Sequence, residues 1–587
     1  MADETNSAIP TLEDWQHWTL VMGRAQQMLM EFWAESLKKD QPFPGWSPPA
    51  FGFGEQSAAA DPMALMSAGA QAWAKGLETW GKLLGGVAVS PADEKERKDR
   101  RFAAPEWSEN PIFDTIRQTY LRLSDQLLGT VDEIDGIDPA TRDKLRFATR
   151  SFVDAMSPSN FALTNPQVLK KTIETRGENL LKGLANMLKD IAAGQLTQTK
   201  PGVFEVGRNL ATTPGKVIKQ TKLYQLIQYT PATDEVLKTP VVIFPPWINR
   251  FYILDLSPEK SFVKWCVDNG ISLFMVSWKS ADESIADASL DDYVLNGQID
   301  AIDTVRDLLG VESVHAIGYC VAGTTLAATL AYLAAKKQQD RVKSATFLTA
   351  QVDFSEAGDL KLFTGPETMG LLEELTKEKG YLDGRYMAAT FNLLRGRDLI
   401  WSYVVNNYLL GEEPAPFDLL HWNSDTTNLP AGWHRDYLES LYKGNKLAVS
   451  GAISVAGTPI DIDAVKTPTY VQAGREDHIA PPQSVWKIMD HFGGPMRFVL
   501  AGSGHIAGVV NPPAAQKYQY WVNDKPAATL ESFIAGATEH KGSWWPDWLA
   551  WLKKQDSETV PAKGARVPGK GKLKAIEDAP GSYVKAR

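Results

Sequence analysis

Apolar positions in the first part of the chain, up to about residue 200, recur with the spacing of an α-helix rather than of a strand. The clearest apolar stripe has spacings of three and four residues and consists of Phe113, Ile116, Tyr120, Leu123 and Leu127. Asp138 before Pro139 is typical of a helix start, with the aspartate as N-cap and the proline in the first turn. Residues 166–191 form another amphipathic run. We therefore predict a mainly α-helical N-terminal domain over residues 1–200.

From about residue 201 the pattern changes to short β-branched runs that alternate with helical segments. The candidate strands are residues 223–229, 240–244, 272–277, 313–318, 344–348, 467–473 and 496–500. This alternation predicts an α/β domain over residues 201–587, with a mostly parallel sheet that is covered by helices.

A long, mainly helical insertion interrupts this second domain at about residues 351–458. We expect it to form a cap, because an insertion between late strands lies over the carboxyl ends of the sheet, where ligands bind in this architecture. The final segment, about residues 555–587, carries several lysines among Gly and Pro and is expected to be an extended tail. The pattern leaves open whether this tail is solvated or docked.

Charge and cysteine content narrow the class of protein. A formal net charge of -10 argues against a general nucleic-acid binder, since phosphate neutralisation needs clustered Lys and Arg. Cys266 and Cys320 are the only cysteines, which excludes a disulfide framework and fits a reducing cytosol. The N-terminus lacks the regions of a signal peptide, and the most apolar stretch, near residues 326–335, is about half the roughly 20 residues that span a bilayer. We expect a cytoplasmic protein without a transmembrane segment.

The strongest chemical signal is the run Gly318-Tyr319-Cys320-Val321-Ala322-Gly323, which lies between a candidate strand and a helical segment. A strand, a Gly-rich turn and a helix in this order are the context of a nucleophile elbow. Gly318 avoids a clash at the turn, and the small residues after Cys320 let helix and strand approach. The N-terminus of the helix favours a thiolate. An alternative interpretation is a packing turn without chemistry.

Two further motifs supply partners for Cys320. Asp477 follows the candidate strand 467–473, and His505 follows the strand 496–500. Nucleophile, acid and histidine thus occur in the chain order of the α/β-hydrolase fold. His505 would accept the thiol proton, and Asp477 would orient His505 and stabilise its charged form. Backbone amides of Val321 and of Trp247, in the loop after residues 240–244, are the expected oxyanion donors.

Other candidate residues receive simpler interpretations. Cys266 lies on an apolar helical face and is expected to be a buried packing residue. His478 is either a pocket residue or the holder of a structural hydrogen bond. The remaining histidines lack the spacing of metal ligands, so no metal site is predicted. No dinucleotide or phosphate-loop motif occurs.

A cysteine nucleophile favours acyl transfer. Exchange of one thioester for another costs little free energy and keeps the acyl group activated, and a hydroxyl can then accept it as an oxoester. Such an enzyme suits repeated transfer if the cap excludes water that would hydrolyse the intermediate.

At these motifs, and at several others, the sequence resembles the polyhydroxyalkanoate synthases. The matching segments are residues 157–161, 204–209, 245–256, 318–323, 422–425, 474–478, 503–508 and 579–585. The resemblance covers roughly residues 100–587, and the first hundred residues match less well. The length and the ending resemble the class I synthases, which favour short acyl chains.

This resemblance implies an α/β-hydrolase fold with a helical cap insertion, and a triad at Cys320, Asp477 and His505. It implies polymerisation of (R)-3-hydroxyacyl-CoA, chiefly 3-hydroxybutyryl-CoA, with release of CoA and without a cofactor. Either His505 or Asp477 would activate the 3-hydroxyl. Candidate pocket residues are Tyr319, Asn249, Asp255, Trp422, His478 and Ala507, the last at a position linked to chain-length preference. The family also implies a homodimer on the surface of cytoplasmic polyester granules, where phasins are possible partners.

Two rival functions share some of these features. A cysteine-dependent esterase or an intracellular polyester depolymerase would share the fold and the elbow, but would not need the N-terminal domain. A granule-coating protein would use the amphipathic helices alone and would leave the triad unexplained.

Overall fold

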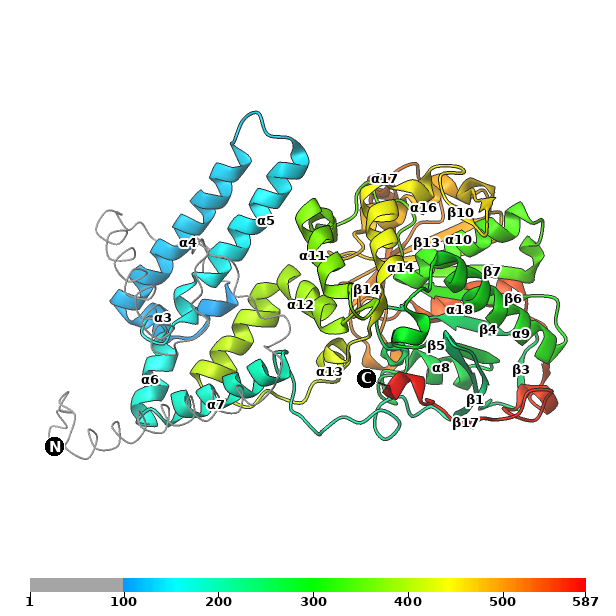
Figure 1. Ribbon diagram of the computed structural model, residues 1–587, viewed down its shortest axis with the longest axis horizontal. Helices are drawn as coiled ribbons and strands as arrows, with labels where there is room; N and C mark the ends of the chain where they lie inside the picture. The colour runs from blue at the N-terminus through cyan, green and yellow to red at the C-terminus, as the bar shows by residue number, and fades with distance from the viewer. Residues whose placement is uncertain (1–98, 587) are drawn as a thin grey trace. The chain divides into compact units, whose positions relative to one another are not determined.

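The computed structural model describes residues 99–586 (Figure 1). The chain divides into two compact units. The first consists of Met1–Lys200 together with Ala389–Ala415, and the second of Pro201–Ala388 with Pro416–Arg587. The first hundred residues, whose role the sequence leaves open, lie almost entirely outside the described part of the chain.

The first unit is helical, as the sequence predicts. Its helices are α3 (Glu106–Glu109), α4 (Pro111–Asp132), α5 (Pro139–Ala155), α6 (Pro166–Glu174) and α7 (Glu178–Ala193). Asp138 caps α5 by accepting a hydrogen bond of 3.0 Å from the amide of Thr141, which confirms the predicted helix start. Tyr120 is buried with Trp107 in a small core, whereas Leu127, at the end of the predicted stripe, is 46% exposed. This unit therefore buries only part of its apolar stripe.

The amphipathic run at residues 166–191 is not one helix. It is divided into α6 and α7 by Gly177, whose φ of 89° lies in the left-handed region that glycine adopts most readily. The apolar spacing continues across this break, and periodicity alone therefore did not reveal it.

Residues 389–415 were expected to belong to the cap of the second domain, but they group with the first unit. The π-helix η10 (Val404–Leu409) packs so closely on α7 that a Cβ on Gly183 would lie 1.8 Å from the carbonyl oxygen of Tyr408. The side-chain amide of Asn179 donates to the carbonyl of Leu409 at 2.7 Å. The insertion therefore contributes residues to both units, and a helical pattern in the sequence does not indicate which part belongs to which unit.

The second unit is built on an eleven-stranded sheet with the order β15-β14-β13-β12-β7-β6-β4-β5-β2-β1-β17. Its six central strands are parallel: β4 (Val241–Phe244), β5 (Leu273–Trp278), β6 (Val314–Tyr319), β7 (Val342–Leu348), β12 (Thr469–Gly474) and β13 (Met496–Ala501). The antiparallel flanks are β2 (Tyr224–Tyr229), β1 (Gly215–Gln220), β17 (Glu577–Asp578), β14 (Gln519–Val522) and β15 (Thr538–Lys541). All seven predicted strands occur, and the predicted α/β fold is confirmed.

Each face of the sheet carries its own core. In β4, Val242 and Phe244 face one core, and Val241 and Ile243 face the other, as the period of a strand requires. Helices α9 (Asp300–Leu309) and α10 (Val321–Ala335) cover the first face, and α8 (Phe262–Asp268) and α18 (Trp545–Gln555) cover the second (Figure 1). Cys320 packs against both cores. Its position at the end of a central strand is therefore fixed from both sides.

The cap of the second unit is mainly helical. It comprises α11 (Pro366–Thr376), α12 (Gly384–Leu394, whose last turns belong to the first unit), α13 (Asp418–Ser424), α14 (Ala431–Asp436) and the π-helix η11 (Tyr437–Lys443). Among the described helices, none is long and apolar enough to cross a membrane.

The C-terminal segment is docked, which answers the question that the sequence left open. β16 (Thr559–Pro561) pairs with β3 (Glu235–Leu237), and β17 pairs with β1. Arg566 is buried and donates to the carbonyl of Leu237 at 3.0 Å, and Val584 is only 1% exposed. The tail is thus an integral part of the second unit.

Candidate active site

Cys320 lies at a sharp turn between β6 and α10. Its backbone has φ 51° and ψ -126°, a strained combination for a residue with a side chain, of the kind that clusters at functional sites. A Cβ on Gly318 would lie 2.6 Å from the Cα of Gly323, and a Cβ on Gly323 would lie 2.4 Å from the Cβ of Ala350. The glycines therefore let the strand and the helix approach closely enough to hold Cys320 at the apex, as the motif predicts.

His505 and Asp477 lie in the loops after β13 and β12, and the structure brings them together. Nδ1 of His505 and Oδ2 of Asp477 are 2.7 Å apart. The other carboxylate oxygen of Asp477 accepts hydrogen bonds of 2.9 Å from the amides of Ile479 and Ala480. The Asp477 side chain is 0% exposed, so its carboxylate is held in one orientation by three donors.

The charge state of His505 follows from its neighbours. Burial alone would lower the pKa of His505, but the charges and hydrogen bonds of Asp477 and Cys320 outweigh it, so that the pKa is raised well above its usual value. An imidazole that interacts with a carboxylate through one nitrogen and with a thiol sulfur elsewhere can hold the proton that the thiol gives up. The three side chains together can therefore generate a thiolate–imidazolium pair.

Tyr437 and Tyr442, on η11, are site residues that the sequence did not single out. Both side chains are buried, and burial is the main cause that raises the pKa of each phenol; Tyr442 and then Cys320 add to it for Tyr437, and Cys320 adds to it for Tyr442. In the sequence, these tyrosines are recognisable only as part of an aromatic-rich helical segment in the predicted cap.

Tyr319, the residue before Cys320, is buried beneath the triad. Its hydroxyl donates to the carbonyl of His505 at 3.2 Å, and the two rings are 5.9 Å apart. Burial raises the pKa of Tyr319, so its phenol stays neutral. Its side chain supports the backbone that carries His505.

The two predicted oxyanion donors lie at the expected ends of elements. Val321 is the first residue of α10, where backbone amides have no partner inside the helix. Trp247 follows β4, and its ring packs at 5.3 to 5.6 Å against Tyr293, Trp433 and Tyr437. This aromatic cluster fixes the backbone of the loop after β4 against the cap.

The remaining predicted pocket residues have different environments. Trp422 is 4% exposed, and its indole nitrogen donates to the carbonyl of Arg250 at 2.7 Å. Asn249 is half-buried and forms an isolated bridge with Thr426. His478 and Ala507 are half-buried in the loops that carry Asp477 and His505.

Asp255 forms hydrogen bonds that hold its own loop in place. Its carboxylate accepts hydrogen bonds from the hydroxyls of Thr213 at 2.6 Å and Ser261 at 2.7 Å. Burial raises the pKa of Asp255, against the effect of these two hydroxyls. These contacts tie the loop after β4 to Thr213 and Ser261, and they involve no residue of the triad.

Cys266 is fully buried in α8, and burial raises the pKa of its thiol well above the usual value, as expected for a packing residue. Within residues 99–586, no group of three or more His, Cys, Asp and Glu side chains is arranged to hold a metal ion.

Comparison with known proteins shows which families and which relatives the chain matches. Residues 98–266 match the family model described as the Poly-beta-hydroxybutyrate polymerase (PhaC) N-terminus, and residues 240–512 match the model described as the alpha/beta hydrolase fold. The chain is 46% identical over 534 residues to the poly(3-hydroxyalkanoate) polymerase subunit PhaC of Rhizobium meliloti (strain 1021), with 90% of this chain and 86% of that protein covered. It is 43% identical over 495 residues to the subunit PhaC of Cupriavidus necator, with 83% of each covered. It is 37% identical over 515 residues to the poly(3-hydroxyalkanoate) polymerase 1 of Ectopseudomonas oleovorans, with 87% and 90% covered.

The sheet order, the elbow and the matched model define an α/β-hydrolase-fold protein that is preceded by a helical unit. The length and the sequence identity of the matches establish the family as well as the fold. The chain belongs to the poly(3-hydroxyalkanoate) polymerase (PhaC) family.

Proposed function

We propose that this protein polymerises (R)-3-hydroxyacyl-CoA, chiefly 3-hydroxybutyryl-CoA, into polyhydroxyalkanoate, with Cys320 as the covalent carrier. The observation that carries the proposal is the buried pair of His505 and Asp477, 2.7 Å apart, next to a cysteine held on a strained elbow. It is supported by relatives that are named poly(3-hydroxyalkanoate) polymerases and that match this chain over most of its length.

In the acylation step, the Cys320 thiolate attacks the thioester carbonyl of the substrate. A carbon–sulfur bond to Cys320 forms, the carbon–sulfur bond to CoA breaks, and the imidazolium of His505 gives its proton to the departing CoA thiolate. The backbone amides of Val321 and Trp247 are the proposed donors to the oxyanion of the tetrahedral intermediate. One thioester replaces another, so the acyl group stays activated.

In the extension step, a 3-hydroxyl attacks the acyl group on Cys320, an ester bond forms, and the sulfur leaves as a thiolate. The neutral imidazole of His505 takes the hydroxyl proton. We favour His505 over Asp477 as this base because the Asp477 carboxylate already accepts three hydrogen bonds and is 0% exposed. Asp477 then stabilises the imidazolium that forms.

The proposal extends to residues and partners around the triad. Tyr319, Asn249, Trp422, His478 and Ala507 are proposed to shape the acyl pocket, whereas the bracing contacts of Asp255 favour a structural role. No resident cofactor is required, because the CoA thioester arrives already activated. We further propose a class I enzyme that acts as a homodimer at the surface of cytoplasmic polyester granules, where phasins are possible partners.

The test is to incubate the purified full chain with (R)-3-hydroxybutyryl-CoA and to measure free CoA, free 3-hydroxybutyrate and polymer in the same samples. We expect CoA release matched by ester-linked 3-hydroxybutyrate in polymer. CoA release matched by free acid, without polymer, would instead identify a cysteine-dependent esterase or depolymerase.

A matched pair of variants separates catalysis from folding. Cys320→Ala should abolish CoA release while the melting temperature is preserved. Cys266→Ala, at the buried cysteine of α8, should retain turnover. Turnover retained by Cys320→Ala would refute both enzyme functions, and folded wild-type protein that coats polyester without any turnover would support a granule-coating role.

A further inference from the structure

Arg250, in the loop after β4, is a buried charge that the proposed chemistry does not use. Its side chain is 2% exposed, and its Nε lies 3.4 Å from Oδ1 of Asp425, whose side chain is 1% exposed. A buried arginine requires partners for several N–H groups, because burial of an unpaired charge is costly. The partners of Arg250 come from two distant parts of the second unit.

One set of partners is the C-terminal end of the chain. Nη1 of Arg250 donates to the carbonyl of Tyr583 at 3.2 Å, and Nη2 donates to the carbonyl of Ala586 at 2.6 Å. Both acceptors are backbone atoms, so the contact depends on where this segment lies rather than on its side chains.

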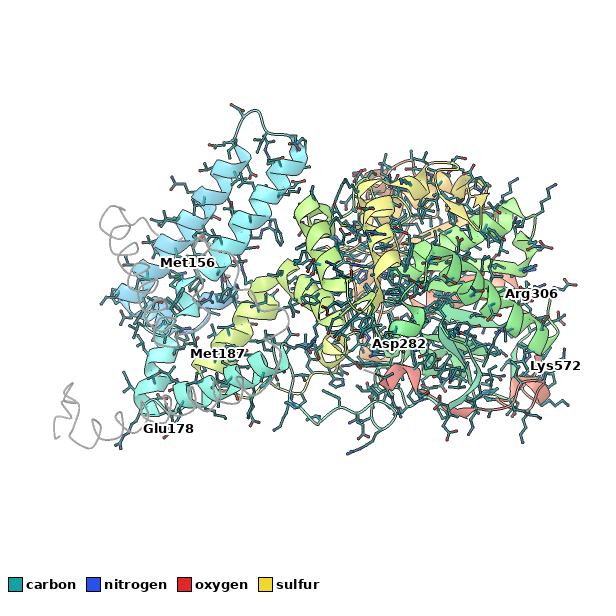
Figure 2. All side chains as sticks on the ribbon, in the orientation of Figure 1. Met156, Glu178, Met187, Asp282, Arg306 and Lys572 are labelled. Carbon is teal, nitrogen blue, oxygen red and sulfur yellow. The ribbon has the colours of Figure 1, made fainter. Side chains whose placement is uncertain are left out.

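Ser582 and Tyr583 are themselves anchored to β2 and to the turn before it, in the antiparallel flank of the sheet. The side-chain amide of Gln225, in β2, donates to Ser582 at 3.0 Å, and its carbonyl accepts from the amide of Tyr583 at 3.1 Å. The Tyr583 hydroxyl donates to the carbonyl of Thr221 at 2.6 Å. Burial and the carboxylate of Asp282, labelled in Figure 2 near the red C-terminal segment, raise the pKa of Tyr583. Ser582 and Tyr583 are therefore held in a defined place.

The other set of partners is the segment that follows α13. Besides the ion pair with Asp425, Nη2 of Arg250 donates to the carbonyl of Thr426 at 3.0 Å. Asp425 also accepts a hydrogen bond of 2.8 Å from the Tyr252 hydroxyl, and the Arg250 carbonyl accepts from the indole of Trp422 at 2.7 Å. Arg250 thus joins the loop after β4 to the cap and to the end of the chain through one guanidinium group.

We propose that Arg250 is a positioning residue, and that residues 583–586 form a latch that sets the loop after β4 through it. This loop carries Trp247, the proposed oxyanion donor, and its Arg250 carbonyl orients Trp422. The inference rests on the proposed function for its effect on turnover, but the latch itself is a statement about structure. An error of about 1 Å in the position of a catalytic group can cost about 100-fold in rate.

The latch is tested with a chain that ends at Ser582 and with Arg250→Gln. Both should lower kcat/KM for CoA release by about 10- to 100-fold, because the loop carries the proposed oxyanion donor Trp247 and its Arg250 carbonyl orients Trp422 of the proposed acyl pocket. The double variant should be no slower than the slower single one, since both changes break the same contact. Losses that multiply in the double variant would overturn the proposal.

Lys572→Ala is the matched control, because it removes a different contact of the C-terminal segment, with the carbonyl of Asp307 at 3.3 Å, and leaves Arg250 and residues 582–586 unchanged. It should keep kcat/KM within about threefold of wild type. Since Arg250→Gln leaves Asp425 buried without its cation and can prevent folding, the truncated chain alone is sufficient for the test.

Hydrogen exchange separates failure of the latch from failure of the proposed function. The truncation should speed amide exchange at residues 245–256 and 422–427 and leave residues 503–508 unchanged, whether or not the wild type forms polymer. Alkylation of Cys320 by iodoacetamide should stay within about twofold, because the triad does not depend on the latch. Unchanged exchange at residues 245–256 would overturn the latch, and a wild type without turnover would refute only the proposed function.

Discussion

Replacing Asp477 by asparagine is the sharpest perturbation of the triad. Oδ2 of Asp477 lies 2.7 Å from Nδ1 of His505, and Oδ1 accepts the amides of Ile479 and Ala480 at 2.9 Å. If the asparagine oxygen keeps the two backbone amides, its NH₂ group faces Nδ1 of His505 and favours the wrong tautomer. The substitution also removes the charge that raises the pKa of His505.

The expected loss can be derived from these contacts. The corresponding change in a serine triad lowers kcat by about 10⁴-fold. A cysteine is the stronger nucleophile and depends less on its base. We therefore expect kcat/KM for CoA release to fall on the order of 1000-fold, which is about 4 kcal/mol. Without the carboxylate, the pKa of His505 should fall toward its usual value of 6.5, and Cys320 should be alkylated more slowly at pH 7.

The assay combines CoA release with the rate of iodoacetamide labelling at Cys320, each on protein whose melting temperature has been measured. Asp547→Asn is the control, because the Asp547 carboxylate pairs with Arg497 at 2.6 Å and accepts from the Tyr470 hydroxyl at 3.0 Å rather than from a residue of the triad. Asp547→Asn should retain wild-type turnover. If Asp477→Asn kept kcat/KM within about tenfold of wild type and labelled at the same rate, the assignment of Asp477 as the partner of His505 would be refuted.

Three further outcomes test the fold and the setting of the site. Gly318→Ala should destabilise the protein by about 1–3 kcal/mol and displace Cys320, because its Cβ would lie 2.6 Å from the Cα of Gly323; unchanged melting temperature and turnover would contradict this. Burial lowers the pKa of His315 and of His434 to about 4, so the unfolded chain binds more protons below pH 6.5, and stability is lost as the pH falls from 6.5 toward 4. Each of the two histidines should lower the free energy of unfolding by about 2 kcal/mol between pH 7 and pH 5, as measured by urea titrations. His434→Gln should make this pH dependence less steep. Asp154→Ala, which removes ion pairs of 3.2 and 2.7 Å to two arginines, should lower the free energy of unfolding of the helical unit by about 1–3 kcal/mol, as measured by circular dichroism.

The central features of the site are local, and the sequence therefore predicted them. Gly318 and Gly323 define the elbow within six residues, and the central strands are apolar on both faces because helices cover both sides. Asp477 and His505 each directly follow such a strand, so the chain order was sufficient to propose a triad.

Features that depend on distant contacts did not follow from the sequence. Tyr437 and Tyr442 lie near enough to Cys320 for its charge to raise their pKa values only because the cap folds over the sheet, and the sequence of their segment resembles any aromatic-rich helix. Strand β15 (Thr538–Lys541) is polar and exposed at every position, so it carries no alternation that predicts a strand. Residues 389–415 have a helical pattern, but the pattern does not state which unit they join.

The docking of the C-terminal segment also could not be predicted from the sequence. Its Gly, Pro and Lys content is typical of a solvated tail, and its placement depends on backbone acceptors for Arg250, which lies more than three hundred residues earlier in the sequence. Backbone carbonyls are present in every sequence, so composition gave no signal for this contact.

The central claim is that the acyl group is carried on the sulfur of Cys320. Butyryl-CoA tests it most directly, because it offers the same thioester as the proposed substrate but no 3-hydroxyl for extension. After brief incubation, mass spectrometry of the digested protein should find one butyryl group on the peptide that contains Cys320, lost on treatment with hydroxylamine. Cys266→Ala should give the same adduct and Cys320→Ala none. An adduct on another residue, or one that persists in Cys320→Ala, would contradict the account.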